Sequence, residues 1–432
     1  MMNRTTARRL SVAASPLIVA AVASGCGASA APAIPTFSRD VLPIVQAKCQ
    51  DCHREGGRDL GGMVAPMALT SYAEIQPWAA AIRTAVESDR MPPWHAAPEF
   101  RGRFRNERYL TEQEKRTILG WVDGGAPAGD PADSPPPATF ASTASDGWSI
   151  GEPDLIVRLP EPYLVRDEVN DEYVDFEVEI TPEMLPEYGW IKAVEFRPGS
   201  EVVHHVIARP LGGLAPGYEP REYPDGYSRL LRTGTTVNFQ MHYHKTPGEG
   251  TAVWDQTEAG IVFYDPGEQI THVVEVESLG MYGFNIPAGD PDYSNHTQYT
   301  FEKDANILWF NPHMHLRGKA ARYVATFPDA REEVLLYVPS YDFSWQHTYY
   351  FNEPVFAPEG TRIELTLWWG NSAANPSNPD PTRNVEWGRP TTDEMGFGWM
   401  YLAEAEPRSI VVGEPIPEDL PAPRPLFRRD SD

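Results

Sequence analysis

The feature that most constrains this chain is a change of sequence pattern on either side of a proline-rich stretch. Residues 126–145 are rich in Pro, Ala, Ser and Asp and include Pro135, Pro136 and Pro137, which is typical of a semi-rigid linker. The sequence before it has the pattern of helices, whereas residues 148–407 form short strand-like runs separated by Pro and Gly. We therefore expect a multidomain protein, with a small all-α domain followed by two all-β antiparallel, jelly-roll-like sandwiches.

Helix signals support the all-α prediction for residues 38–127. Ser38 is placed to cap a first helix, residues 71–87 are Ala-rich, and Thr111 and Glu114 have capping-box spacing before an apolar run. A chain of 432 residues is long enough for several cores. The expected segments are a leader at 1–26, the helical domain at 30–127, a linker at 128–147, β domains at 148–282 and 283–410, and a tail at 411–432.

The first residues have the pattern of an export signal. Arg4, Arg8 and Arg9 precede a mostly small and apolar run that is too short for a permanent membrane anchor. The sequence ending at Cys26 resembles a bacterial lipoprotein box, which implies lipid attachment at that cysteine. The alternative is plain secretion with cleavage after Ala30. We expect a periplasmic or cell-surface protein whose only attachment to a membrane is a lipid anchor.

The charge balance limits the partners. A formal net charge of -25 and a pI of about 4.8 repel nucleic acid and anionic lipid, so neither is an expected partner. The same charge favours a basic redox partner.

A haem-attachment motif stands early in the helical segment. Cys49 and Cys52, followed directly by His53, give the C-x-x-C-H pattern, in which two thiols bind the haem vinyl groups and the imidazole binds iron. The alternative is a reduced dithiol. We predict one covalent haem c, and hence a cytochrome c-like domain at 30–127.

The sixth iron ligand is predicted to be Met91, because a thioether raises the haem potential. Met63 and Met67 compete for this role. The sequence around Met91 resembles the M-P-P-W motif of bacterial cytochrome c modules, and His95 after it is expected to be a surface or edge residue rather than a ligand.

Six histidines form three clusters in the β region: His204 with His205, His242 with His244, and His313 with His315. Residues two apart on a strand share a face, so the last two pairs can each point at one metal. Adjacent residues can do so only at an edge or bulge. Imidazole suits copper, zinc, iron and nickel. Because the haem motif uses Cys49 and Cys52, only nitrogen or nitrogen-plus-thioether coordination is left for this metal.

These motifs resemble those of the copper type II, ascorbate-dependent monooxygenases, whose familiar members are the peptidylglycine α-hydroxylating and dopamine β-monooxygenases. The resemblance covers about residues 148–406 and is closest to bacterial forms. The motifs stand in the family's order: Val203-His204-His205-Val206, Gln240-Met241-His242-Tyr243, His313-Met314-His315 and Asp393-Glu394-Met395.

The resemblance implies two coppers, one in each β domain. The electron-transfer copper would be bound by His204, His205 and His242. The copper that binds dioxygen would be bound by His313, His315 and Met395, which also form the catalytic set. A soft thioether at Met395 favours Cu(I).

Other candidates have simpler interpretations. Met314 would point away from the face shared by His313 and His315 and is expected to fill the core. Three interpretations of His244 stay open: a group that supports the metal ligands, a substrate-cleft residue or a surface residue. Three histidines without partners in sequence are expected to be structural: His272, His296 and His347.

The implied reaction inserts one oxygen atom of dioxygen into a C–H bond and needs two electrons. A fused haem would relay them from an external donor, either an ascorbate-like reductant or a redox protein. Asn311 stands where peptide-amidating members have an arginine, so no peptide carboxylate anchor is expected. Phe397 and Trp399 instead suggest an apolar cleft for a small organic substrate.

Two other functions remain open from the sequence. The first is a non-enzymatic electron-transfer or copper-binding lipoprotein that performs no oxygenation. The second is a zinc-dependent hydrolase, in which Met395 and a redox haem would have no role.

Overall fold

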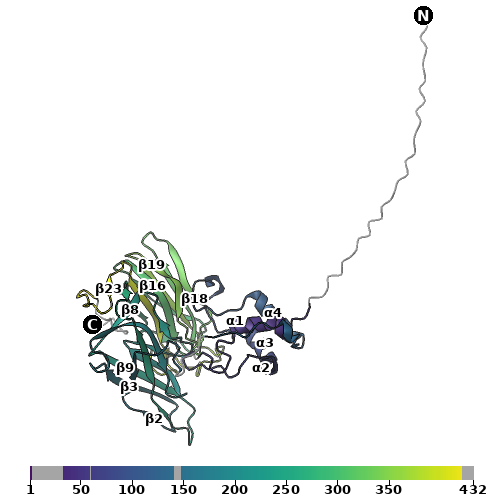
Figure 1. The fold of residues 1–432 in the computed structure, drawn as a ribbon, viewed down its shortest axis with the longest axis horizontal. Helices are drawn as coiled ribbons and strands as arrows, with labels where there is room; N and C mark the ends of the chain where they lie inside the picture. Colours follow the sequence, from purple (N-terminus) through teal and green to yellow (C-terminus); the bar gives the residue numbers. More distant parts are fainter. Residues whose placement is uncertain (2–32, 59, 141–146, 421–432) are drawn as a thin grey trace. The chain divides into compact units, whose positions relative to one another are not determined.

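Short helices and long irregular segments make up the first part of the chain in the computed structural model, which describes residues 1, 33–58, 60–140 and 147–420 (Figure 1). The helical elements are the π-helical η1 (Phe37–Val41), α1 (Leu42–Lys48), α2 (Tyr72–Ile75), the 3-10 turn η2 (Gln76–Trp78), α3 (Ala79–Glu87), η3 (Pro98–Phe100), α4 (Glu112–Asp123) and η4 (Pro131–Asp133).

Capping explains where the two best-defined helical runs begin. The predicted capping box of Thr111 and Glu114 is confirmed at the start of α4, and Ser71 forms a second one at α2. The expected helix at 71–87 is interrupted by η2, where Pro77 supplies no backbone N–H. Ser38 does not cap a helix, because it lies buried inside η1.

The first sandwich packs a four-stranded antiparallel sheet, in the order β3-β9-β5-β6, against one half of a nine-stranded sheet. Its strands are β1 (Leu155–Arg158), β3 (Asp171–Glu179), β4 (Tyr188–Arg197), β5 (Val203–Arg209), β6 (Gly212–Leu214), β7 (Arg221–Glu222), β8 (Tyr227–Arg232), β9 (Thr236–His244) and β11 (Glu258–Phe263). A short ladder at one side joins β2 (Tyr163–Val165) to β10 (Val253–Asp255).

The second sandwich packs the sheet β15-β20-β17-β18 against the other half of the nine-stranded sheet. Its strands are β13 (His272–Gly280), β15 (Tyr293–Thr300), β16 (Ala305–Met314), β17 (Gly318–Thr326), β18 (Glu332–Val338), β19 (Tyr349–Ala357), β20 (Arg362–Trp369) and β22 (Gly396–Glu404). Two further short ladders pair β12 (Gln269–Ile270) with β23 (Ile410–Val411) and β14 (Asn285–Ile286) with β21 (Val385–Glu386).

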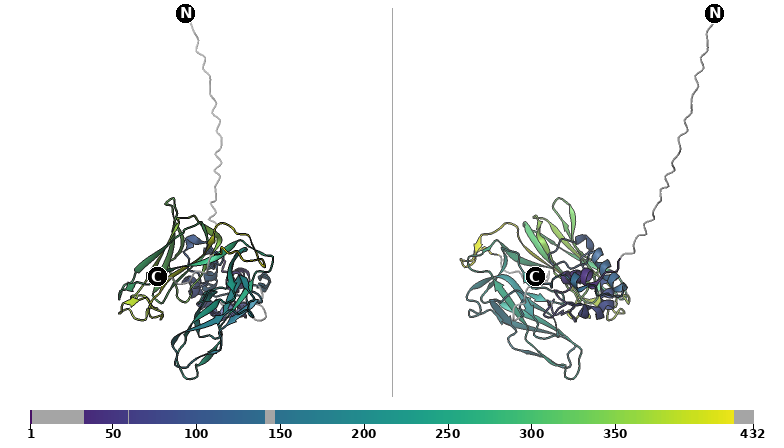
Figure 2. Two further views of the ribbon diagram at one scale, coloured as in Figure 1. Left: turned by 90° about the vertical axis from the view of Figure 1, so that its left-hand side faces the viewer. Right: turned by 45° about the vertical axis from the view of Figure 1, so that its right-hand side comes forward.

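One continuous sheet joins the two sandwiches, which lie side by side in Figure 2. The junction is a parallel pairing of β8 with β13, in which His272 lies opposite Tyr227. Each sandwich has its own core of inward-facing apolar residues, as the alternating strand patterns predict. The predicted boundary near residue 282 falls just after β13.

The predicted fold class is wrong in its first part. Strands account for 38% of the structure and helices for 12%, and no all-α cytochrome c domain is evident in the described segments. Pro35–Asp432 form one compact unit, and Phe100 and Phe104 belong to the core of the second sandwich, where Phe104 bridges Phe351. The helix signals are real but local, because the apolar residues between α3 and α4 are buried by a sheet.

The predicted export signal and Cys26 lie outside the described residues. Within the described part of the chain, no helix combines the length and apolarity needed to cross a membrane.

Candidate metal and haem sites

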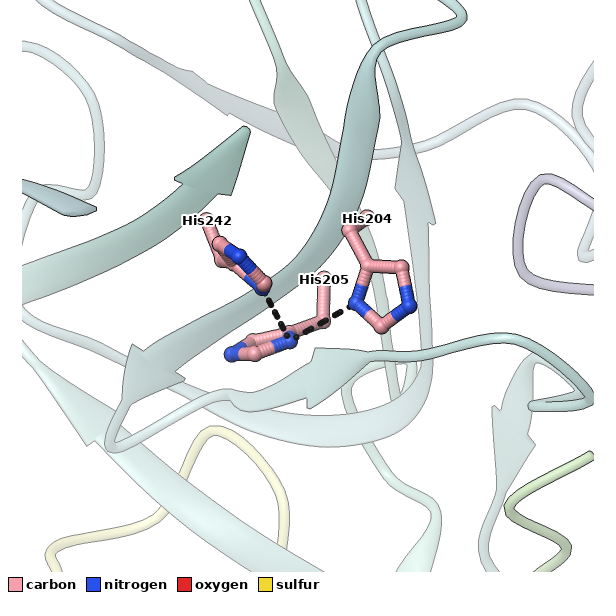
Figure 3. A group of neighbouring side chains, drawn as sticks. All are labelled: His204, His205 and His242. Atoms are coloured by element: carbon pink, nitrogen blue, oxygen red, sulfur yellow. Dashed lines mark hydrogen bonds between the residues drawn. The ribbon is translucent and has the colours of Figure 1, made fainter. Parts of the chain in front are cut away.

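Three histidines converge in the first sandwich where β5 and β9 pair (Figure 3). His205 lies opposite His242, and a bulge shifts the register between Val203 and His205. The bulge brings the side chains of the adjacent His204 and His205 to the same side. On a regular strand, adjacent side chains would point to opposite faces. The Nδ1 atom of His205 lies 3.3 Å from Nδ1 of His204 and 3.2 Å from Nδ1 of His242.

Two histidines of this triad, His204 and His205, are held in the neutral form. Burial, followed by the nearby His242 and His244, lowers the pKa of His204 to about 3, and burial lowers the pKa of His205 well below its usual range. One nitrogen from each of the three residues lies within 4.8 Å of the others, so their lone pairs could hold one metal ion.

Asp171 supports the triad and carried no signal in the sequence. Its carboxylate hydrogen-bonds Nε2 of His242 across a separation of 71 residues, which leaves Nδ1 of His242 facing His205. Burial raises the pKa of Asp171. The hydrogen bond and the electrostatic interaction with His242 outweigh that effect, so the pKa of Asp171 is lowered overall. Nδ1 of His244 lies 3.5 Å from the same carboxylate, so His244 belongs to the surroundings of the triad.

His313 and His315 form a second pair at the end of β16, with ring centroids 5.4 Å apart. Nδ1 of His313 lies 2.6 Å from Oε1 of Gln346, and Nδ1 of His315 lies 3.3 Å from the Asp393 carbonyl oxygen. An acceptor on Nδ1 fixes the proton there and leaves Nε2 of each ring as the free donor to a metal. Burial lowers the pKa of His313 to about 4, although the Gln346 bond raises it.

Met395 immediately precedes β22, the strand that pairs with β16. The β16–β22 register pairs Met314 with Gly396, so the next residue on each strand brings Met395 level with His315. Met395 is half-buried, and its carbonyl accepts a hydrogen bond from the Trp369 indole.

Glu394 fixes the backbone of the turn that carries His315. Its fully buried carboxyl accepts the backbone N–H of His315 at 2.9 Å and that of Arg317 at 2.6 Å. Burial raises the pKa of Glu394 to about 8, although the two N–H groups lower it. Only its place next to Met395 drew attention to this residue in the sequence.

The two histidine sets face one aromatic ring. Phe343, on the segment between β18 and β19, stacks on His204 with centroids 5.1 Å apart and meets His315 edge-on at 5.8 Å. A cavity of about 60 Å³ reaches from His205 to His313 and is also lined by Trp399. The structure therefore brings together residues from both predicted copper sets.

The haem motif lies where α1 ends. Cys49 is the C-cap residue of α1, and Cys49 and Cys52 are free thiols. Nδ1 of His53 lies 3.1 Å from the carbonyl oxygen of Met67, an arrangement that orients an iron-binding imidazole and leaves Nε2 free.

A cavity of about 780 Å³ opens next to this motif. Its volume falls in the range of sites for sizeable ligands. Cys49, Cys52 and His53 line it together with all three methionines proposed as the sixth ligand, namely Met63, Met67 and Met91.

The remaining predicted residues have local explanations. Met314 is fully buried in the second core. Nδ2 of Asn311 donates to the His347 carbonyl, while its Oδ1 accepts from the Tyr218 hydroxyl. His272 stacks on Tyr227. The rings of Phe397 and Trp399 stack, and Trp399 lies 5.7 Å from His313. His296 lies on β15.

Comparison with known proteins identifies no family. No family model matches the chain, and no curated protein matches it. Among solved structures, the cowpea mosaic virus top component is 8% identical, with 63% of this chain and 97% of that chain covered and a TM-score of 0.23. A two-domain protein of unknown function from Bacteroides fragilis is 9% identical, with coverages of 60% and 99% and a TM-score of 0.16. Similarities this weak carry no argument about function.

Proposed function

We propose that this chain is an exported copper-dependent monooxygenase with a covalently attached haem c, which hydroxylates a C–H bond of a small organic substrate. The observation that carries the proposal is that both histidine sets contact Phe343, on which His204 stacks and whose ring His315 meets edge-on. These residues come from the sequence motifs that resemble the copper type II, ascorbate-dependent monooxygenases.

The triad fits copper by its donor chemistry and spacing. Nitrogens bound at about 2.0 Å in a tetrahedral arrangement lie roughly 3.3 Å from one another. The observed Nδ1 separations of 3.3 Å and 3.2 Å match that value. All three donors are imidazoles, which suit copper, and Asp171 orients His242 in the manner of metal-binding histidines.

The second set fits a copper that must be stable as Cu(I). Two imidazoles with free Nε2 atoms and one soft thioether are a donor set that favours the reduced ion. Gln346 and the Asp393 carbonyl fix the rings of His313 and His315. Glu394 fixes the turn that carries His315, so the donors are held in place before a metal binds.

The haem motif fits a porphyrin because its cavity is large and mainly apolar, and His53 is oriented by a backbone carbonyl. Bound haem would supply a one-electron store, and bound copper would supply one-electron chemistry and affinity for dioxygen. The residues of the chain would hold these groups, and a cavity of about 60 Å³ is lined by both His205 and His313.

The overall reaction consumes one substrate C–H bond, dioxygen, two electrons and two protons, and yields an alcohol and water. An external donor, either an ascorbate-like reductant or a redox protein, provides the electrons. Trp399 and Phe397 beside His313 favour an apolar substrate.

The test is oxygen uptake by periplasm-expressed holoprotein with a panel of apolar organic substrates and ascorbate as donor. We expect uptake coupled to a hydroxylated product, and loss of both in His313→Ala. His296→Ala, on β15, is the control and should leave uptake unchanged. Copper and haem binding without substrate-coupled uptake would instead indicate the electron-transfer or copper-binding role. Zinc as the sole bound metal would indicate the hydrolase.

A further inference from the structure

Two more histidines meet away from the predicted copper sets. His95 follows the Met91 motif, and His347 precedes β19 in the second sandwich. Their ring centroids lie 5.4 Å apart with the ring planes at 37°. No sequence motif pairs them, because they are about 250 positions apart and belong to different segments.

The buried nitrogens of this pair have no hydrogen bond of normal geometry to the protein. His347 is only 2% exposed, and neither of its ring nitrogens makes such a bond, although the Gly217 backbone lies close enough to affect its pKa. Nδ1 of His95 is also buried without a partner. A buried polar group without a hydrogen bond destabilises the fold, so three of them in one place call for a bound ion or water.

The surroundings keep both imidazole rings neutral and favour a bound ion of low charge. Trp94, Trp345 and Tyr349 surround His347 at 5.8, 5.9 and 6.3 Å between ring centroids. Burial lowers the pKa of His347 well below its usual range, the neighbouring His95 and Arg108 lower it further, and the Gly217 backbone acts in the opposite direction. Burial also lowers the pKa of His95, against the charge of Asp342.

The ring spacing matches that of histidines that could share one ion. Within the triad, the centroids of His204, His205 and His242 are 4.7 to 5.5 Å apart. The 5.4 Å between His95 and His347 falls inside this range. A nearby guanidinium and an aromatic wall disfavour a dication more than a monocation.

We propose that His95 and His347 bind one Cu(I) ion, forming a third metal site between the haem-motif segment and the second sandwich. Two neutral imidazoles suit a singly charged ion that accepts low coordination numbers. Gln346, adjacent to His347, hydrogen-bonds His313, so the site lies on the segment that also supports the second copper set.

The experiment is Cu(I) titration of the full chain against a colorimetric Cu(I) chelator, for the unsubstituted protein, His347→Phe, His95→Phe and the control His272→Phe. Phenylalanine keeps an aromatic ring in the packed position. We expect each of His347→Phe and His95→Phe to bind one Cu(I) fewer per chain, with the thermal midpoint and haem absorbance retained. The control should bind the same amount as the unsubstituted protein.

Equal Cu(I) binding in both variants and the unsubstituted protein would overturn the proposal and indicate bound water at the pair. If His347→Phe bound less zinc but as much Cu(I) as the unsubstituted protein, the assignment of the ion as Cu(I) would be overturned. This test is distinguishable from the test of the proposed function. If the proposed function failed, His242→Ala and His313→Ala would bind as much copper as the unsubstituted protein, whereas His347→Phe would still bind one Cu(I) fewer per chain.

Discussion

At the residue scale, the candidate site depends on side chains that fix the histidines rather than on the histidines alone. Asp171 binds Nε2 of His242, and Gln346 binds Nδ1 of His313. Each contact selects the nitrogen that a bound metal would face. Residues of this kind lie far along the chain from the ligands they orient, so no local motif identifies them in advance.

Asp171→Asn should weaken copper binding at the triad by about 10–100-fold, because an amide is a poorer acceptor for the ring N–H of His242. The measurement is a copper-chelator competition on the full chain. Asp175→Asn, on the same strand, is the control, since Asp175 contacts Gln240 and not a triad histidine. Equal affinity in both variants would show that Asp171 does not orient His242.

Gln346→Leu should reduce copper binding at His313 and His315 by a similar factor of about 10–100, because the His313 ring loses the acceptor that fixes its proton on Nδ1. The electron paramagnetic resonance of the Cu(II) form reports the change at this set without reference to turnover. Unchanged spectra and affinity would contradict the assigned role.

At the element scale, the bulge in β5 and the turn after β16 decide which histidines meet. The clusters themselves were recognisable in the sequence, and the two-residue spacing of His313 and His315 predicted a shared face. For the adjacent His204 and His205 the sequence required an edge or a bulge, but it did not decide between them, because the register depends on pairing with β9. Phe343 between the sets was missed for the same reason: loop positions follow from tertiary packing.

Glu394→Gln should destabilise the protein by about 1–3 kcal/mol, because an amide replaces a buried carboxyl that accepts two backbone N–H groups at the turn of His315 and Arg317. Denaturant unfolding of the metal-free chain measures this free energy. Glu386→Gln, at an exposed site on β21, is the control. A loss no larger than the control's would show that the turn does not depend on Glu394.

At the scale of the whole molecule, the sequence predicted the sandwiches better than the helical part. Alternating strand patterns report burial directly, and both cores formed as expected. Helix capping reports only local structure, so it did not reveal that Phe100 and Phe104 enter the core of the second sandwich. The predicted independent all-α domain was wrong for that reason.

Phe104→Ala should therefore destabilise the second sandwich as well as the haem-motif segment, by about 3–5 kcal/mol. Phe104 is 3% exposed and contacts Trp94, Tyr349 and Phe351. Thermal unfolding followed by tryptophan fluorescence and far-ultraviolet circular dichroism should show both signals shifting together. A shift confined to the helical signal would indicate that the segment unfolds independently.

The central claim is tested most directly by quantifying haem and copper in periplasm-expressed holoprotein, beside His242→Ala and His313→Ala. The account predicts one haem c per chain in all three proteins, and the loss of one copper per chain in each variant relative to the unsubstituted protein. A protein that carries its haem but binds no copper through His313, His315 and Met395 would contradict it.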